Sequence, residues 1–291
     1  MKKIKKSELP IGIFDSGLGG LTVVKEIINL LPNEDIIYLG DTARVPYGSK
    51  SKETIIKYSI QNTKFLLKHN IKLLVVACNT SSSYAVEKLK KDFKKLHIIE
   101  VVTPGAKTAL KTTKNYKIGV IGTKATIKSR SYEKIIKKLC KKAKVYMQAT
   151  PLFVPLIEEG WVDEVYKNKK YTQKQRINNK NIIKQVAIEY LKSLKKQNID
   201  VLVLGCTHYP AIKMILQDIV GNKVKIVDSA VETSKEVKEV LIKNNLLNSK
   251  KTGKIKFYVT DDPQSFKIIG SMLLNKKIQN VKKIEVSILE K

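Results

Sequence analysis

Two cysteines occupy matching positions in two similar stretches of the chain. Cys78 ends the run IKLLVVAC (71–78), and Cys206 ends the run IDVLVLGC (199–206). Each run is apolar, as in a buried strand, and each cysteine is followed by residues that favour a helix start. A helix N-terminus lowers the pKa of a thiol and favours the reactive thiolate. We therefore predict two reactive sulfurs, one from each half of the chain.

Other chemical uses of these cysteines fit the sequence less well. The third cysteine, Cys140, lies in a lysine-rich helical pattern, and an odd number of cysteines does not suggest a disulfide framework. Cys206 and His208 have a spacing that could begin a metal site, but no cluster of further ligands accompanies them. A Cys–His hydrolase would use the same pair and would leave Cys78 without a role. We predict that no metal ion is bound.

A glycine-rich segment near the start of the chain also has the form of a ligand-binding turn. The sequence FDSGLGGLTVVKE (14–26) predicts a strand, a glycine turn and a helix, a shape that suits anion binding. It partly matches a dinucleotide fingerprint, but Thr22 stands where that fingerprint needs glycine or alanine. With no phosphate-loop or pyridoxal-binding signature either, we expect a protein that uses no cofactor.

Short apolar runs alternate with helical patterns along the chain, which is typical of an α/β fold with parallel strands. The predicted strands are 11–14, 35–40, 71–77, 97–102, 116–122, 144–149, 199–205, 223–227 and 255–260. The predicted helices lie near 20–31, 51–68, 82–95, 127–141, 174–197, 210–220 and 230–245. The similar cysteine-bearing runs indicate two similar parallel-sheet domains related by a pseudo-twofold axis. Since ligands bind outside the carboxyl ends of such strands, the active site is expected in the cleft between the domains.

The chain carries a formal net charge of +30, which raises the alternative of a protein that binds nucleic acid or another polyanion. The positive charge comes mainly from lysines spread along the whole chain, without an arginine-rich arm. We therefore expect no specific nucleic-acid partner and only weak, salt-dependent binding of polyanions. No run approaches the roughly 20 apolar residues that a membrane span needs, and no apolar run follows the basic N-terminus. We expect a cytoplasmic protein without a membrane partner.

Six motifs, taken together and in this order, resemble those of glutamate racemases in the aspartate/glutamate racemase family. They are FDSGLGGLTV (14–23), GDTARVPYG (40–48), VVACNTSS (75–82), GTKATIKS (122–129), LFVPLIEEG (152–160) and LGCTHYP (204–210). The resemblance extends from Ile11 to about Asp262. It implies two α/β domains, the first formed by residues 1–102 plus 227–291 and the second by residues 103–226. It also implies a cofactor-independent enzyme.

The resemblance assigns roles to individual residues. Cys78 and Cys206 match the proton donor and acceptor of a two-base mechanism, and Asp15, Glu158 and His208 match groups that tune the two thiols. The positions that match substrate-binding residues are Asp15, Ser16, Tyr47, Gly48, Asn79, Thr80, Thr123, Thr126, Thr207 and His208. By this comparison, Cys78 is expected to deprotonate D-glutamate.

The chemistry of the residues agrees with these implied roles. A proton α to a carboxylate is barely acidic, so its removal needs a close base, and its replacement on the other face needs a second acid. The resemblance predicts interconversion of L- and D-glutamate, which supplies D-glutamate for peptidoglycan, by a protein that forms a homodimer. A related racemase of aspartate or another small acid remains the alternative function.

Overall fold

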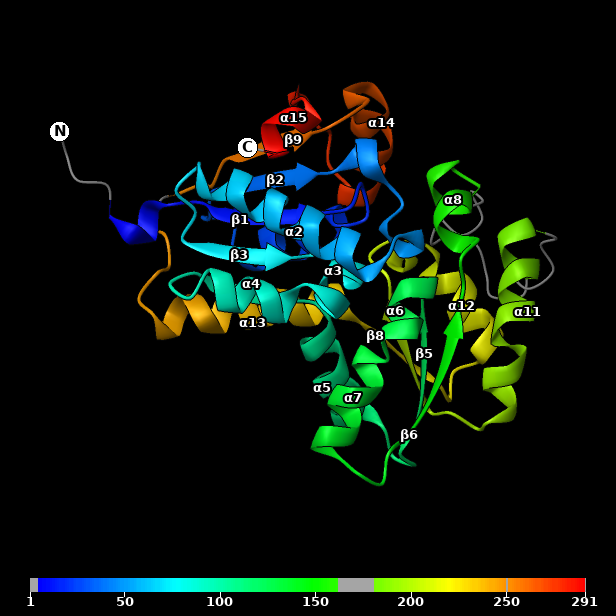
Figure 1. The fold of residues 1–291 in the computed structure, drawn as a ribbon. Helices are drawn as coiled ribbons and strands as arrows, with labels where there is room; N and C mark the ends of the chain where they lie inside the picture. The colour runs from blue at the N-terminus through cyan, green and yellow to red at the C-terminus, as the bar shows by residue number, and fades with distance from the viewer. Residues whose placement is uncertain (1–4, 162–180, 250, 291) are drawn as a thin grey trace.

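In the computed structural model, which describes residues 5–161, 181–249 and 251–290, the strands form two parallel sheets (Figure 1). The first sheet has the order β10-β9-β2-β1-β3-β4. Its strands are β1 (Ile11–Asp15), β2 (Ile36–Gly40), β3 (Leu73–Val76), β4 (His97–Glu100), β9 (Ile255–Val259) and β10 (Val281–Lys283). The second sheet has the order β6-β5-β7-β8, with β5 (Lys117–Gly122), β6 (Lys144–Ala149), β7 (Val201–Gly205) and β8 (Lys225–Asp228).

Helices cover both faces of the first sheet. One face packs against α1 (Leu21–Leu30), α13 (Ser229–Lys243) and α14 (Pro263–Leu274). The other packs against α2 (Lys52–Leu67), α4 (Val86–Asp92) and α15 (Val286–Glu290). Because both faces are covered, the central strands β1, β2 and β3 are buried along their whole length. Their residues are apolar except for Asp15, a buried carboxyl group at the end of β1.

The second sheet is also covered on both faces. Helices α5 (Val102–Thr112) and α7 (Ser131–Leu139) pack on one face, and α8 (Phe153–Glu158), α11 (Ile182–Lys196) and α12 (Lys213–Val220) pack on the other. Two short helices, α3 (Asn79–Tyr84) and α6 (Lys124–Ser129), begin just after β3 and β5 and contact one another. This contact brings together turns from the two sheets, which form separate lobes in Figure 1.

The predicted fold class is confirmed, and each predicted strand is present within a few residues of its expected bounds. The predicted helix 82–95 is instead two helices that begin at Asn79. The predicted helix 127–141 is interrupted at Arg130, whose φ of 54° belongs to the left-handed region. Of the predicted helix 174–197, residues 174–180 lie outside the described residues.

Four further helices among the described residues, α5, α8, α14 and α15, were not predicted. Pro104 and Gly105 made the start of α5 look like a loop. Pro104 instead lies in the first turn of the helix, where its missing N–H removes no helical hydrogen bond. Proline likewise begins α14 at Pro263. The three-residue strand β10 was too short to leave a pattern.

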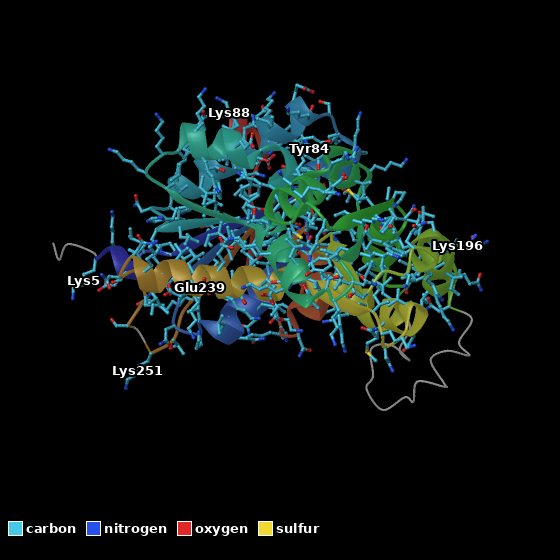
Figure 2. All side chains as sticks on the ribbon, turned by 90° about the horizontal axis from the view of Figure 1, so that it is seen from below. Lys5, Tyr84, Lys88, Lys196, Glu239 and Lys251 are labelled. Carbon is cyan, nitrogen blue, oxygen red and sulfur yellow. The ribbon has the colours of Figure 1, made fainter. Side chains whose placement is uncertain are left out.

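The surface lysines are dispersed over the molecule. Figure 2 shows Lys5, Lys88, Lys196 and Lys251 at widely separated edges, with their side chains directed outward. Their separation agrees with the even spread of lysine along the sequence. Within the described residues, no helix is both long enough and apolar enough to cross a membrane.

Candidate active site

The two predicted cysteines lie at equivalent places in the two sheets. Cys78 follows β3 and precedes α3, and Cys206 follows β7 and precedes the 3₁₀ helix η4 (Tyr209–Ile212). Both side chains are almost fully covered, with 5% and 6% of their surface exposed. Parallel strands β1 and β3, and likewise β5 and β7, are direct neighbours, so the turns that follow them lie at one edge of each sheet. The expectation of two sulfurs at matching strand ends is therefore met by the geometry.

The surroundings of Cys78 do not activate its thiol in the way predicted from the helix N-terminus. Burial, and then the nearby charge of Asp15, raise the pKa of Cys78 to about 11. The Sγ of Cys78 lies 3.7 Å from the Oγ of Ser16, and this contact offsets only part of the increase. The prediction of a lowered pKa is wrong because desolvation of the thiolate outweighs the partial charges of a helix only six residues long.

The imidazole of His208 lies beside the thiol of Cys206. The Nδ1 of His208 lies 3.8 Å from the Cys206 Sγ, and its Nε2 donates to the Oε1 of Glu158 at 2.9 Å. Burial alone would lower the pKa of His208, but hydrogen bonds and charges of Cys206 and Glu158 raise it well above its usual value. The imidazolium is therefore the favoured form of His208 near neutral pH. The structure thus brings together three of the predicted site residues, two from the Cys206 turn and Glu158 from the end of α8.

Asp15 connects the two turns. Its Oδ2 accepts a hydrogen bond from the Gly17 backbone at 2.9 Å, and the Thr207 hydroxyl lies 3.5 Å from its Oδ1. Burial raises the pKa of Asp15, and the neighbouring His208 partly lowers it. A carboxyl group at the end of β1 therefore interacts both with Cys78 and with the residue that follows Cys206.

Three predicted threonines form a second link between the sheets. The hydroxyl oxygens of Thr80 and Thr123 lie 3.0 Å apart, and Thr126 lies within 3.4 Å of Thr80 and 3.0 Å of Thr123. Gly48 packs against this group so closely that a Cβ there would lie 2.7 Å from the Thr123 Cβ. Short hydroxyl side chains from both sheets therefore converge beside the Cys78 turn.

Tyr47 is placed differently from the other predicted binding residues. It is buried, and its hydroxyl donates to Asp41 and accepts from the Nδ2 of Asn62 at 3.1 Å. Arg44 also binds Asp41, which completes a polar cluster beneath the loop. The Tyr47 hydroxyl is thus engaged within the first sheet's lobe, and of these two residues only Gly48 lines the cavity between the sheets.

A cavity of about 340 Å³ lies over these groups and has residues of both sheets in its wall. The predicted residues that line it are Ser16, Gly48, Thr123, Glu158 and His208. Its volume is in the range of small-molecule sites, and its polar groups are few and placed at one end of the two sheets. Each thiol contacts one lining residue, Cys78 at Ser16 and Cys206 at His208. The arrangement is therefore suited to a small polar ligand that reaches two buried sulfurs.

Gly19 shows how closely the first glycine turn approaches the Cys206 turn. A Cβ at this position would lie 2.3 Å from the Thr207 Oγ1 and 2.4 Å from the His208 Nδ1. The Thr22 hydroxyl, one helical turn further on, donates to the Thr207 carbonyl at 3.0 Å. Glycine is therefore required at position 19, a role that the motif FDSGLGG did not reveal without the structure.

Comparison with known proteins places the chain in a family. Residues 11–237 match the model of the Asp/Glu/hydantoin racemase family, which covers strands of both sheets. This chain belongs to the Asp/Glu/hydantoin racemase family. The resemblance indicated by the six motifs is thereby confirmed.

Relatives with the name glutamate racemase are similar over nearly the whole chain. That of Geobacter metallireducens is 44% identical over 277 residues, which cover 95% of this chain and 96% of the relative. That of Sulfurihydrogenibium is 46% identical over 267 residues and covers 91% and 94%. The solved glutamate racemase of Francisella tularensis, in complex with D-glutamate, has a TM-score of 0.85 at 40% identity and covers 96% and 98%. An isoform from Bacillus anthracis has a TM-score of 0.87 at 36% identity, with the same shares covered.

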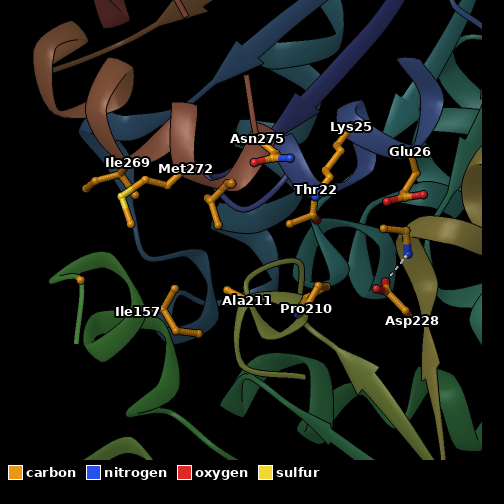
Figure 3. A pocket seen from close by; sticks show the side chains of 13 residues that line it. Thr22, Lys25, Glu26, Ile157, Pro210, Ala211, Asp228, Ile269, Met272 and Asn275 are labelled. Atoms are coloured by element: carbon orange, nitrogen blue, oxygen red, sulfur yellow. Dashed lines mark hydrogen bonds between the residues drawn. The ribbon is translucent and has the colours of Figure 1, made fainter. Parts of the chain in front are cut away.

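This racemase-family chain has a second cavity, of about 500 Å³, on another side of the Cys206 turn (Figure 3). Pro210 and Ala211, from η4, form part of its wall, and α1 and α14 contribute much of the rest. Figure 3 shows Lys25, Glu26 and Asp228 toward one end and Ile269 and Met272 toward the other. Neither cysteine lines it. The cavity is therefore distinct from the candidate active site.

Proposed function

We propose that this chain interconverts L- and D-glutamate and that Cys78 and Cys206 transfer the α-proton. The observation that carries the proposal is the pair of buried thiols at equivalent strand ends of two sheets, joined through Asp15. The glutamate racemases that resemble this chain over more than nine-tenths of its length support the choice of substrate.

The reaction requires one proton to leave and one to arrive. A Cys206 thiolate takes the α-proton of L-glutamate, and the electron pair of the broken C–H bond delocalises into the α-carboxylate. The Cys78 thiol then donates its proton to the opposite face of the α-carbon. The product is D-glutamate, with Cys206 now a thiol and Cys78 a thiolate. The reverse reaction uses the same groups with exchanged roles.

The charges around the sulfurs support this distribution of roles in the resting protein. The raised pKa of Cys78 keeps it as a thiol, which can donate a proton. The imidazolium of His208 lies beside the Cys206 Sγ, and Glu158 holds the imidazolium in place. The resting form, with Cys78 as the thiol and Cys206 as the thiolate, therefore reacts with L-glutamate. D-Glutamate reacts with the other form, in which Cys206 is the thiol and Cys78 the thiolate.

Short polar side chains hold the two carboxylates of the substrate in this proposal. Asn79 and Thr80 begin α3 beside Cys78, and Thr207 lies beside Cys206. Ser16, Gly48, Thr123 and Thr126 complete the set, together with the backbone of Tyr47. Donors of this kind also stabilise the negative charge that develops on the α-carboxylate during deprotonation.

We propose the wider setting of the enzyme on the same resemblance. Residues 1–102 plus 227–291 form one domain and residues 103–226 the other, a division that matches the chain segments of each sheet except at β8, whose last two residues lie beyond the second boundary. The enzyme acts in the cytoplasm as a homodimer, and its D-glutamate enters peptidoglycan synthesis. Light scattering in solution tests the dimer, which a single monomeric species at assay concentration would contradict.

The two-thiol mechanism is tested by the circular dichroism of L-glutamate solutions with purified wild type, Cys78→Ser and Cys206→Ser, without added cofactor. Each substitution is expected to lower the rate of racemisation by more than about 100-fold, because it removes one proton-transfer group. The matched control is Cys140→Ser, which changes the remaining, partly buried cysteine and is expected to retain full activity. If both active-site variants racemise as fast as wild type, the two-thiol mechanism is wrong.

The substrate is tested separately, by α-proton exchange in deuterated water with a panel of small amino acids. Glutamate is expected to exchange its α-proton with wild-type protein and to racemise. Exchange of aspartate or another acid, with none for glutamate, would overturn glutamate as the substrate and leave the two-thiol chemistry intact.

A further inference from the structure

The amide of Asn79 has one end bound and the other end without a partner. Its Oδ1 accepts a hydrogen bond from the hydroxyl of Tyr132 at 2.7 Å. Its Nδ2 is buried and has no hydrogen-bond partner among the described residues, although only 2% of the side chain is exposed. Buried amide donors are nearly always paired in native proteins. An unpaired donor one residue after Cys78 therefore points to a ligand that accepts its hydrogen bond.

Tyr132 reaches Asn79 from the other sheet. It lies in α7, which packs on the second sheet, whereas Asn79 begins α3 after a strand of the first sheet. The side chain of Tyr132 is completely buried, and burial raises the pKa of its hydroxyl, which stays protonated as a donor. Because this hydroxyl binds the amide oxygen, the amide nitrogen is directed away from Tyr132.

The ring of Tyr132 is fixed by close packing near the second cysteine. A Cβ on Gly205 would lie 3.2 Å from the Tyr132 Cε2, and a Cβ on Gly105 would lie 3.3 Å from the Cε1. Gly205 immediately precedes Cys206. One side chain therefore packs against the residue before Cys206 and binds the residue after Cys78.

We propose that Tyr132 is a positioning residue of the racemase reaction, which fixes the Asn79 amide so that Nδ2 donates to the α-carboxylate of the substrate. The inference rests on the proposed function. Negative charge on this carboxylate grows as the α-proton leaves, so a donor held in place beforehand stabilises the transition state more than the bound substrate. Without the Tyr132 hydroxyl, the amide is free to rotate and its donor is no longer held in place.

The test is a double-mutant cycle of Tyr132→Phe and Asn79→Ala, measured as kcat and KM for both enantiomers of glutamate. Phenylalanine retains the ring that packs on Gly105 and Gly205 and removes only the hydroxyl. We expect Tyr132→Phe to lower kcat about tenfold, with a smaller change in KM. Asn79→Ala is expected to lower kcat/KM by about 100-fold, as the loss of a transition-state donor does. The double variant is expected to match Asn79→Ala alone, because Tyr132 acts through that amide.

Tyr209→Phe is the matched control. Tyr209 is also completely buried, and its hydroxyl binds Thr150, with 2.6 Å between the side-chain oxygens. Removal of this hydroxyl is expected to lower the thermal midpoint of unfolding about as much as Tyr132→Phe does. Any loss of activity in Tyr209→Phe is expected to multiply with the loss caused by Asn79→Ala in the double variant. A merely structural role for Tyr132 would give the same multiplicative behaviour.

A further variant, Asn79→Asp, separates the two ends of the amide. It retains an oxygen for the Tyr132 hydroxyl and lacks the Nδ2 donor, so it is expected to be as inactive as Asn79→Ala but to unfold at a higher temperature. Three results would each overturn the inference. They are wild-type activity of Tyr132→Phe, a loss of activity in Tyr132→Phe that multiplies with the loss in Asn79→Ala, and an active Asn79→Asp variant. Wild-type protein that leaves glutamate unchanged would instead overturn the proposed function, and the inference with it.

Discussion

The turns that carry Cys78 and Cys206 begin alike and then differ in the charges placed around the sulfur. Each cysteine follows a fully buried parallel strand and is itself almost fully covered. Two residues after Cys78 stands Thr80, a neutral hydroxyl in a cluster of threonines. Two residues after Cys206 stands His208, which binds Glu158 and favours the imidazolium. The same backbone position therefore holds a neutral group in one turn and a cation in the other.

The carboxyl group of Asp15 increases this difference. It adds to the effect of burial in raising the pKa of Cys78, and it lies beside Thr207 in the opposite turn. A repeated fold thus supplies two equivalent sulfurs, while the residues that do not repeat place Asp15 near the Cys78 thiol and His208 beside the Cys206 thiol. In the proposed two-base reaction one thiol donates while the other accepts, so the two sulfurs share one proton in each direction.

The largest expected consequence of the comparison is a different preference for the substrate enantiomer in each one-cysteine variant. In deuterated water, Cys78→Ser retains the Cys206 base and is expected to exchange the α-proton of L-glutamate without racemising it. Cys206→Ser retains Cys78 and is expected to exchange the α-proton of D-glutamate. We expect the two exchange rates within each variant to differ by about 100-fold, as measured by NMR of each enantiomer.

Double substitution provides the control for this exchange experiment. A variant with both cysteines replaced by serine is expected to exchange neither enantiomer above the rate in buffer. Equal exchange of both enantiomers by either one-cysteine variant would contradict the assignment of one face to each sulfur. Reversed preferences would keep the two-base mechanism and exchange the assigned faces.

A smaller effect is expected from Glu158→Gln, which changes the hydrogen-bond partner of His208. Because Glu158 helps to raise the pKa of His208, its replacement by a neutral amide lowers that pKa and lets the imidazolium lose its proton at a lower pH. The alkaline limb of the kcat/KM profile is therefore expected to move to lower pH. The expected loss is about tenfold on the alkaline side and smaller below the shifted pKa.

The neighbouring Glu159 is the matched control for the pH profile, since it is exposed and makes no contact with His208. Glu159→Gln is expected to leave the profile where it is in wild type. A Glu158→Gln profile with the wild-type alkaline limb would show that His208 does not need its carboxylate partner to stay protonated.

The sequence predicted the parts of the site that are encoded locally. The run before each cysteine and the polar residues after it were enough to place both sulfurs at strand ends, because strand and helix-start patterns extend over only a few residues. The contact of Cys206 with His208 lies within three residues of chain and was also considered from the sequence. These elements leave a local pattern that can be read without the fold.

The sequence could not predict effects that depend on three-dimensional surroundings. The direction of the Cys78 pKa shift results from burial and from Asp15, 63 residues away in the chain, and the local helix pattern indicated the opposite. The bond between Tyr132 and Asn79 joins two sheets and leaves no spacing signal. The helix α5 was missed because its proline and glycine look like loop residues until the packing around them is known.

The smallest expected effect concerns the Asp15 charge, and it tests the inequality of the two thiols directly. Iodoacetamide at pH 8 is expected to alkylate Cys206 faster than Cys78, since only the thiolate reacts. In Asp15→Asn, the pKa of Cys78 is expected to fall below about 11, because the second cause of its increase is removed while burial remains. A fall of half to one unit gives roughly three- to tenfold more Cys78 thiolate at pH 8.

Peptide mass spectrometry, which assigns the label to each cysteine, should therefore show that Asp15→Asn narrows the difference between the two alkylation rates. Asp228→Asn is the matched control, because Asp228 is also a largely buried carboxyl group at a strand end, and burial raises its pKa as well. It belongs to β8 and is not among the groups that shift the pKa of Cys78, so the alkylation ratio should stay as in wild type. An Asp15→Asn variant with an unchanged ratio would mean that burial alone separates the two thiols, and that the inequality of the turns comes from the His208 side.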